Sequence, residues 1–233
     1  MRYPNITPGV FVARPNRFIA HVEVEGAVQV CHVKNTGRCR ELLVPGCRVY
    51  LTKSDNPARK TLYDLVAVEK ETEEGPLLIN MDSQAPNRVF GEWAAAGGFR
   101  RALSLLRPET TYGNSRFDYY WEQSEKEPIR GFVEVKGVTL EEKGIVRFPD
   151  APTLRGVKHL EELVVAHEAG YETALCFIVQ MEGMRYLEPN DLTHPEFGAA
   201  VRRAARAGVE VLAMECRVTP DSLTVARPIP VKL

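Results

Sequence analysis

Two carboxylates and one lysine have the residue types and the spacing to do chemistry in this chain: Asp118, Glu134 and Lys136. Successive side chains of a strand point to opposite faces, so Glu134 and Lys136 share one face if this segment is a strand. Two carboxylates can hold a hard divalent cation through oxygen, and an ammonium beside them can assist an attacking water. The pattern is typical of a metal-dependent phosphodiesterase, although a surface strand with a single Glu/Lys pair would show it too.

A magnesium or manganese ion is the cofactor that such a site predicts, because both prefer oxygen ligands. Asp118 and Glu134 on neighbouring strands about 4.8 Å apart can share one ion. Lys136 would then orient or deprotonate a water and offset charge on a phosphate. The predicted metal ligands are all oxygen donors: Asp118, Glu134, the backbone carbonyl of Val135, and as optional additions Glu92 or Glu109, for each of which alone a surface place is favoured.

Length and composition limit the class of protein. The 233 residues suit one large domain or two small ones, and a content of 44% hydrophobic and 26% charged residues suits a folded core. A net charge of −1 gives no overall basic footprint for nucleic acid, so basic residues would have to act locally. No P-loop, dinucleotide-binding or hydrolase nucleophile motif is present.

The expected location is the cytoplasm. No run of about 18 apolar residues is available to span a membrane, and the first residues lack an apolar leader. Five cysteines without a paired motif favour a reducing compartment. Cys31, Cys39 and Cys47 recur every eight residues beside His32, but structural zinc ligands usually come in close pairs, so buried thiols are favoured over zinc.

The order of the expected helices and strands changes near residues 82–86, which divides the chain into two parts. The first part, 1–83, shows five or six short strands with turns such as Glu25-Gly26, which predicts a small antiparallel barrel. The second part, 84–233, alternates helices and strands, which predicts an α/β domain with a mixed sheet. Its expected helices cover residues 87–106 with a break at Gly97-Gly98, 155–169 and 195–207. Its expected strands cover residues 117–122, 131–136, 144–148, 173–181 and 209–216.

The expected helix over residues 155–169 bears one polar stripe, formed by Arg155, His159 and Glu162. This stripe could face the carboxylates and contact a phosphate or a metal-bound water. On sequence grounds a solvated stripe is favoured over this arrangement.

The chain resembles the sugar fermentation stimulation protein family nearly from end to end. The similarity rests on ordered segments: Asn35-Thr36-Gly37, Ser54-Asp55-Asn56-Pro57, Arg59-Lys60, Asn87-Arg88, Tyr112-Gly113, Ser115-Arg116-Phe117-Asp118, Glu134-Val135-Lys136, Val138-Thr139-Leu140, Phe148-Pro149-Asp150-Ala151, Arg155-Gly156-Val157-Lys158-His159-Leu160 and Pro228-Ile229-Pro230-Val231.

This resemblance implies an N-terminal barrel of the oligonucleotide-binding (OB) fold, followed by an α/β domain similar to restriction-endonuclease-like (PD-(D/E)xK) nucleases. It also implies a nucleic-acid partner, DNA before RNA, and a regulatory role in sugar utilisation. The implied nucleic-acid contacts are Lys34, Asn35, Thr36, Arg38, Arg40, Arg155, Lys158 and His159. Phe11, Phe18 and Tyr50 are candidate platforms on which bases could stack, although an aromatic residue of this kind is more often part of the core.

Three functions remain open from the sequence. The first is a divalent-metal-dependent nuclease with Asp118, Glu134 and Lys136 as catalytic residues. The second is a DNA-binding regulator of sugar metabolism genes whose nuclease-type centre is unused. The third is a hydrolase of a small phosphorylated or nucleotide metabolite. The sequence leaves turnover and oligomeric state open, with a homodimer among the options.

Overall fold

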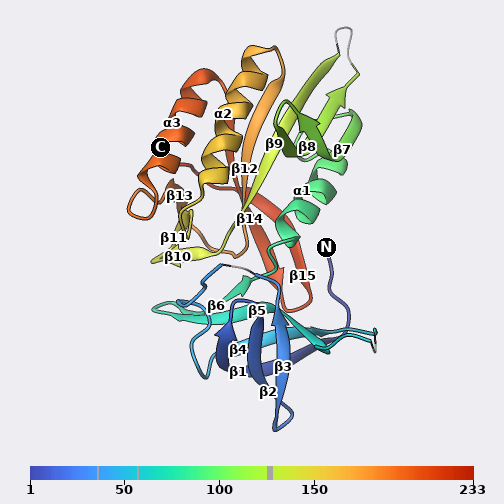
Figure 1. Cartoon of the computed structure of the whole chain (residues 1–233), viewed down its shortest axis with the longest axis vertical. Coiled ribbons are helices and arrows are strands. Elements are labelled where there is room, and N and C mark those ends of the chain that lie inside the picture. Colours follow the sequence, from blue (N-terminus) through green and yellow to red (C-terminus); the bar gives the residue numbers. More distant parts are fainter. Residues whose placement is uncertain (36, 57, 125–127) are drawn as a thin grey trace.

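The structure is a computed structural model that describes residues 1–35, 37–56, 58–124 and 128–233. A barrel formed by the first 80 residues lies at one end, and an α/β unit lies at the other (Figure 1). The N-terminus lies where these parts meet. No helix in the described part of the chain is long and apolar enough to cross a membrane.

The barrel is a six-stranded sheet in the order β3-β2-β1-β4-β5-β6. Its neighbouring strands are antiparallel, and a parallel pairing of β3 with β5 closes it. Positive φ angles of 52° at Glu25 and 81° at Gly26 make the predicted hairpin turn. The strands are β1 (Ile6–Asn16), β2 (Ile19–Val24), β3 (Ala27–Val33), β4 (Arg48–Lys53), β5 (Tyr63–Thr72) and β6 (Gly75–Asn80).

The α/β unit has a six-stranded sheet in the order β15-β14-β12-β9-β8-β7. The three central strands β9, β12 and β14 are parallel and the outer pairs are antiparallel, which makes the sheet mixed. Its strands are β7 (Leu103–Tyr112), β8 (Ser115–Gln123), β9 (Ile129–Val138), β12 (Glu172–Val179), β14 (Glu210–Thr219) and β15 (Ser222–Pro228); a small sheet adds β10 (Leu140–Glu142), β11 (Ile145–Phe148) and β13 (Tyr186–Pro189).

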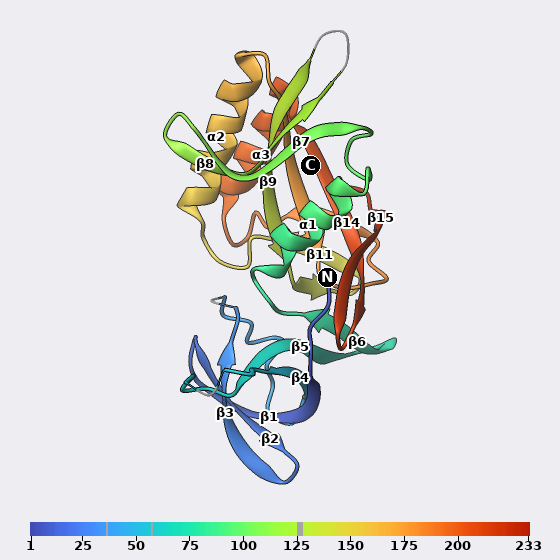
Figure 2. The same cartoon turned by 90° about the vertical axis from the view of Figure 1, so that its right-hand side faces the viewer.

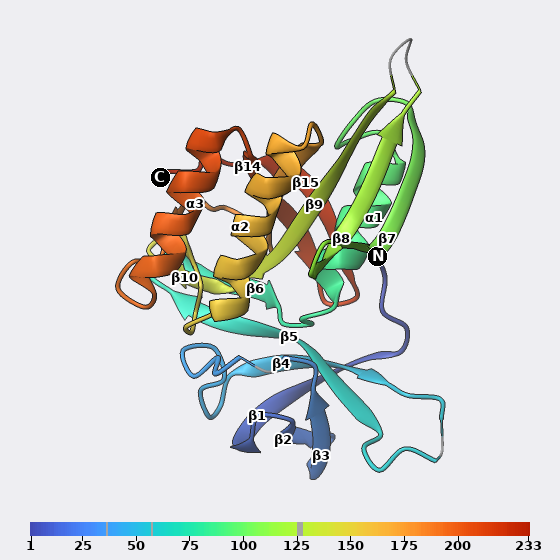
Figure 3. The ribbon, with the colours of Figure 1, turned by 45° about the horizontal axis from the view of Figure 1, so that its top comes forward.

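Helices cover both faces of the large sheet. Helices α2 (Leu154–Glu168) and α3 (Pro195–Ala207) lie on one face, and α1 (Ala85–Ala95) packs against β9 on the other, as Figure 3 shows. Strand β12 is buried on both faces because it lies between these layers, as its continuous apolar run predicted.

The predicted break at Gly97-Gly98 lies just after the end of α1, but the prediction that the helix resumes and continues to residue 106 is wrong. Gly97 has a φ of 83°, a left-handed conformation that ends the helix, and Leu103–Tyr112 forms the edge strand β7. Leu103, Leu105 and Leu106 suit either structure, and pairing with β8 decides for the strand. The sequence does not predict strands β10, β13 and β15. Each is short or lies at the edge of its sheet, where the alternation of apolar and polar residues is weak.

The barrel and the α/β unit meet through a buried polar network around Gln180. Its Nε2 donates to Asn80 Oδ1 at 2.9 Å and to the carbonyl oxygens of Asn80 and Asp82, each at 3.1 Å. Strand β6 contacts β14 at this junction, and Figure 2 shows the end of the β14–β15 hairpin close to the barrel. The predicted domain boundary between residues 83 and 84 falls between β6 and α1 and stays a prediction.

The barrel carries a charge cluster that makes its stability depend on pH. Arg59 Nη1 and His32 Nδ1 lie 2.9 Å and 3.0 Å from the Asp64 carboxylate, whose side chain is 14% exposed. Burial by itself raises the pKa of Asp64, but the hydrogen bonds from Arg59 and His32 outweigh it and hold the pKa below 3.8.

We expect Asp64→Asn to lower the free energy of unfolding by about 1–3 kcal/mol at neutral pH. Because the folded-state pKa is depressed, the stabilisation is complete above the unfolded-state pKa and is lost as the pH falls through the folded-state value. The gap between wild type and variant should therefore shrink as the pH drops below 3.8. Urea unfolding of both proteins across this range measures the gap, and a gap that persists into acid would contradict the assignment.

Candidate functional site

Asp118 and Glu134 meet where strands β8 and β9 separate. Tyr119 and Val133 form the last pair of this antiparallel register, and Asp118 and Glu134 are the residues next to that pair. The β8–β9 pairing starts at Tyr119, so Asp118 lies at its end. There the Asp118 side chain takes the place of a backbone hydrogen bond between the strands, because its Oδ2 accepts the backbone N–H of Val135 at 2.7 Å. The fold therefore brings together the two carboxylates that the sequence singled out.

Glu134 is almost fully buried, at 2% exposure. Its Oε1 accepts hydrogen bonds from Lys136 Nζ and from His159 Nδ1. Burial raises the pKa of Glu134, but the His159 hydrogen bond and the Lys136 charge outweigh it, and the net pKa is lowered. The other oxygen, Oε2, is buried with no hydrogen-bond partner in the described structure. One half of this carboxylate is therefore satisfied and the other half is open.

Asp118 shifts in the opposite direction. Burial and the nearby charge of Glu134 raise the pKa of Asp118. The Val135 N–H, the charge of Lys136 and the Asn87 amide oppose this shift without cancelling it. Two carboxylates in a buried site repel one another, so an added positive charge would favour the ionised form of both.

Helix α2 supplies the histidine of the site. Thr153 caps this helix by accepting the N–H of Gly156 through its Oγ1 at 3.0 Å. His159 follows on the next turn, and its Nε2 lies 3.3 Å from Arg155 Nε. Because Arg155 can only donate, these contacts assign the proton of a neutral His159 to Nδ1, facing Glu134. His159 thus contacts Glu134 and Arg155 contacts His159, whereas Glu162 lies 3.7 Å from Lys158 Nζ.

Asn87 on α1 is a site residue that the sequence did not identify as functional. Its Nδ2 donates to Asp118 Oδ1 at 2.6 Å, and its carbonyl accepts from the Tyr119 hydroxyl at 2.9 Å. The only signal in the sequence was its place in the Asn87-Arg88 segment of the family resemblance. An amide carries no catalytic signature, and only the packing of α1 against the sheet brings it to Asp118.

The structure does not bring the two optional carboxylates to the site. Glu92 lies 2.6 Å from the Met1 amino group and 3.1 Å from Arg88 Nε. Glu109 is exposed and pairs with Arg116 at 3.0 Å. Over the described residues, no group of three or more His, Cys, Asp or Glu side chains is arranged to hold a metal ion. A metal at this site would therefore have two carboxylates and would need further oxygen from the backbone or from water.

The barrel-loop residues that are predicted to contact nucleic acid differ in whether they have protein partners or are exposed. Lys34 reaches the junction, where its ammonium lies 2.7 Å from Asp82 Oδ2. Asn35 Oδ1 accepts the Gly37 N–H at 2.7 Å. Arg38 and Arg40 are exposed. Thr36 lies outside the described residues. The contacts of these residues with nucleic acid stay predictions.

Lys158 and the proposed aromatic platforms differ in exposure. Lys158 is exposed on α2 and donates to the Asn114 carbonyl at 3.2 Å. Phe18 is 48% exposed beneath the Arg17 guanidinium and remains available for stacking. Phe11 is only 2% exposed, so its interpretation as a platform is wrong; it belongs to the barrel core. Tyr50 is partly buried and donates its hydroxyl to Glu69.

Comparison with known proteins agrees with both parts of the fold. The family model described as "SfsA N-terminal OB domain" matches residues 12–77, and "Sugar fermentation stimulation protein RE domain" matches residues 84–222. The predicted OB barrel followed by an α/β domain with a mixed sheet is thereby confirmed.

Relatives match over the whole length. A sugar fermentation stimulation protein homolog of Desulfitobacterium hafniense (strain Y51) is 53% identical over all of this chain and 99% of its own. One from Ruminiclostridium cellulolyticum is 49% identical over the full length of both. The solved structure of Pyrococcus furiosus SfsA in complex with Ca²⁺ superposes with a TM-score of 0.85 at 25% identity, covering 100% of this chain and 98% of that one. The chain belongs to the sugar fermentation stimulation protein (SfsA) family.

Proposed function

We propose that this protein is a divalent-metal-dependent phosphodiesterase that acts on nucleic acid, with DNA as the first candidate. The observation that carries the proposal is the buried, unpartnered Oε2 of Glu134 beside Asp118 in the described structure. A buried carboxylate oxygen without a partner costs free energy, and a bound cation would offset that cost.

The donors fit a hard cation. In a strand, the N–H and C=O of one residue point to the same neighbour, as paired residues exchange both bonds. Because the Val135 N–H points to Asp118, its carbonyl also faces that side and could add a third oxygen. Oxygen-only donors suit Mg²⁺, Mn²⁺ or Ca²⁺. The Pyrococcus relative, described as a complex with Ca²⁺, supports an oxygen-ligand site in this family.

Each side chain would have a distinct task in hydrolysis. A bound divalent ion supplies a Lewis acid and lowers the pKa of a water. Lys136, held by Glu134, would stabilise the negative charge that develops on a phosphate. His159 fixes the orientation of Glu134, and exposed Arg155 at the outer end of the stripe can contact a flanking phosphate. The barrel would hold the strand.

A cleavage screen of single- and double-stranded DNA and RNA tests this function, with Mg²⁺ or Mn²⁺ added and with EDTA as the metal-free arm. We expect cleavage with metal, none with EDTA, and a loss of about 10²-fold or more in Lys136→Ala, because its ammonium acts only as charge develops. Lys143→Ala, an exposed lysine in the turn after β10, is the matched control. Full activity in Lys136→Ala would refute the assignment. Hydrolysis of small phosphorylated or nucleotide metabolites without cleavage of nucleic acid would instead support a metabolite hydrolase.

A second candidate function is supported by the ion pairing of Glu134. Lys136 and His159 already partner one Glu134 oxygen, and the described residues supply no third carboxylate. A Glu134 that is already paired with two basic side chains suits a DNA-binding regulator whose nuclease-type centre is unused. That regulator would bind DNA without divalent ions and would keep its affinity in Glu134→Gln, with affinity falling as salt rises.

A further inference from the structure

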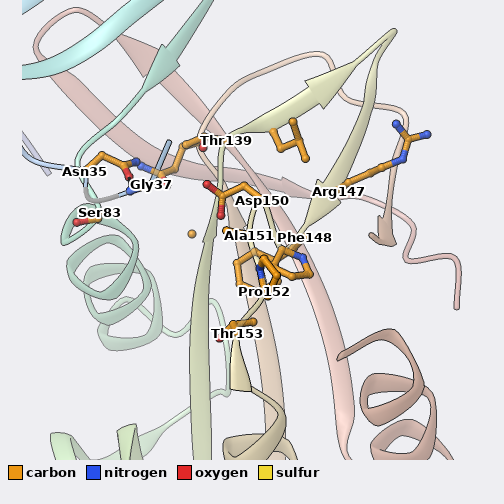
Figure 4. Close-up of a pocket in the computed structure, with 14 residues that line it drawn as sticks. Asn35, Gly37, Ser83, Thr139, Arg147, Phe148, Asp150, Ala151, Pro152 and Thr153 are labelled. Carbon is orange, nitrogen blue, oxygen red and sulfur yellow. Dashed lines mark hydrogen bonds between the residues drawn. The ribbon is translucent and has the colours of Figure 1, made fainter. Parts of the chain in front are cut away.

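A pocket of about 360 Å³ lies between the barrel loop and the α/β unit (Figure 4). It borders the candidate site: Gly137 follows Lys136 on β9, and Thr153 caps the helix that carries His159. Asn35 and Gly37 reach it from the barrel. Residues from two segments of the family resemblance thus meet at this pocket without a role in the proposed chemistry: Asn35 and Gly37 from the barrel, and Phe148, Pro149, Asp150 and Ala151 from the α/β unit.

Gln180 presents an open acceptor to this pocket. The residue is 1% exposed, and its Nε2 is committed to acceptors on Asn80 and Asp82, which fixes the orientation of the amide. Its Oε1 has no hydrogen-bond partner among the described residues. A Cβ on Gly137 would lie 2.6 Å from that oxygen and 2.5 Å from Pro86 Cγ, so the glycine lets Gln180 and the start of α1 pack close to β9, where Gln180 lines the pocket.

Asp150 adds a carboxylate. Its Oδ2 would lie 2.7 Å from a Cβ on Gly37, so the barrel loop packs directly against it. The one cation of the described lining, Arg147, is bound to Glu188 at 2.7 Å and Glu142 at 2.9 Å, and Figure 4 shows it directed away from Asp150. The pocket therefore disfavours a phosphate and favours a ligand that donates hydrogen bonds.

Flat apolar groups form the wall below these acceptors. Phe148, Pro149 and Pro152 line the pocket together, and Phe148 is fixed from behind by Phe177 and Phe197 at ring distances of 5.6 and 5.2 Å. A rigid apolar surface with a few polar groups at its edge is the environment in which proteins hold an unstacked base.

We propose that this pocket binds one nucleobase of the substrate strand and prefers guanine. The proposal rests on the proposed function, because it gives the strand a register: phosphate at Lys136 and Arg155, base in the pocket. Guanine presents adjacent N1–H and N2–H donors, which match the Asp150 carboxylate and Gln180 Oε1. Adenine and cytosine present one exocyclic amine beside an acceptor nitrogen, and thymine presents a single N–H between two carbonyl groups.

The test measures binding of short thymidine oligonucleotides by the full chain in EDTA, so that no cleavage occurs. One central thymidine is replaced by dG, dA, dC or deoxyinosine, which lacks the 2-amino group. We expect dG to tighten binding about tenfold over the other natural bases, and deoxyinosine to lose most of that gain. Asp150→Asn should abolish the preference, because one acceptor becomes a donor. Asp55→Asn, the same change at an exposed barrel position, should keep it.

The outcomes separate this proposal from the proposed function. Cleavage with metal but equal binding of all bases overturns the pocket and leaves the phosphodiesterase intact. A dG preference without cleavage of any substrate keeps the pocket and overturns the phosphodiesterase. Equal thermal stabilisation by deoxyguanosine and thymidine monophosphates would also count against the pocket. Thermal unfolding of Asp150→Asn checks that the variant is folded, and the deoxyinosine arm needs no variant.

Discussion

Glu134→Gln is expected to reduce metal-dependent cleavage by about 10³-fold, at the upper end of what loss of one preorganised electrostatic group costs. The substitution keeps the shape of the side chain and removes its charge. Its Oε1 would still accept from Lys136 and His159, but the open Oε2 position would no longer belong to a carboxylate. The loss should therefore fall on metal binding and on rate, with the fold retained.

Two measurements separate these effects. Initial cleavage rates across a Mg²⁺ or Mn²⁺ titration show the loss, and thermal unfolding with and without Ca²⁺ reports binding independently of turnover. A ligand that binds the folded state raises its stability, so the wild type should gain and Glu134→Gln should not. Glu161→Gln, the same change at an exposed position on α2, is the control. An equal gain in thermal stability with Ca²⁺ in Glu134→Gln and Glu161→Gln would mean that the ion binds elsewhere.

Phe177→Ala is expected to lower the free energy of unfolding by about 3–5 kcal/mol, the usual cost of truncating a buried phenylalanine. Phe177 is 1% exposed in the central strand β12 and packs on Phe148, which lines the pocket. Neighbours on both sides of the sheet limit how far the cavity can collapse. The effect should therefore lie in the upper part of the range for point substitutions.

Urea unfolding followed by circular dichroism measures this change. Phe18→Ala, at 48% exposure on the barrel, should cost less than about 1 kcal/mol because little packing is lost there. Equal costs at the two positions would contradict the burial pattern on which the fold description depends.

Local pattern in the sequence was sufficient for much of the fold. Alternation predicted that Glu134 and Lys136 share a face, and helical spacing predicted that Arg155 and His159 form one stripe; both pairs are in contact in the structure. The same kind of reasoning failed between Gly97 and Tyr112, where leucines fit a helix and a strand equally well. There the choice depends on pairing with β8, a contact that local periodicity does not encode.

The sequence by itself determined the family, because ordered motifs along nearly the whole chain resemble it. It also determined the order of barrel and α/β unit and the residue types at the carboxylate site, because these depend on residue order and on periods of two and 3.6 residues. Only the tertiary structure decided that Asp118 reaches the Val135 N–H, that Asn87 joins it, and that Glu92 and Glu109 have other partners. It alone shows that Gln180 and Asp150 line one pocket. Strand register and the packing of barrel against sheet set these contacts, and both depend on residues far apart in the chain.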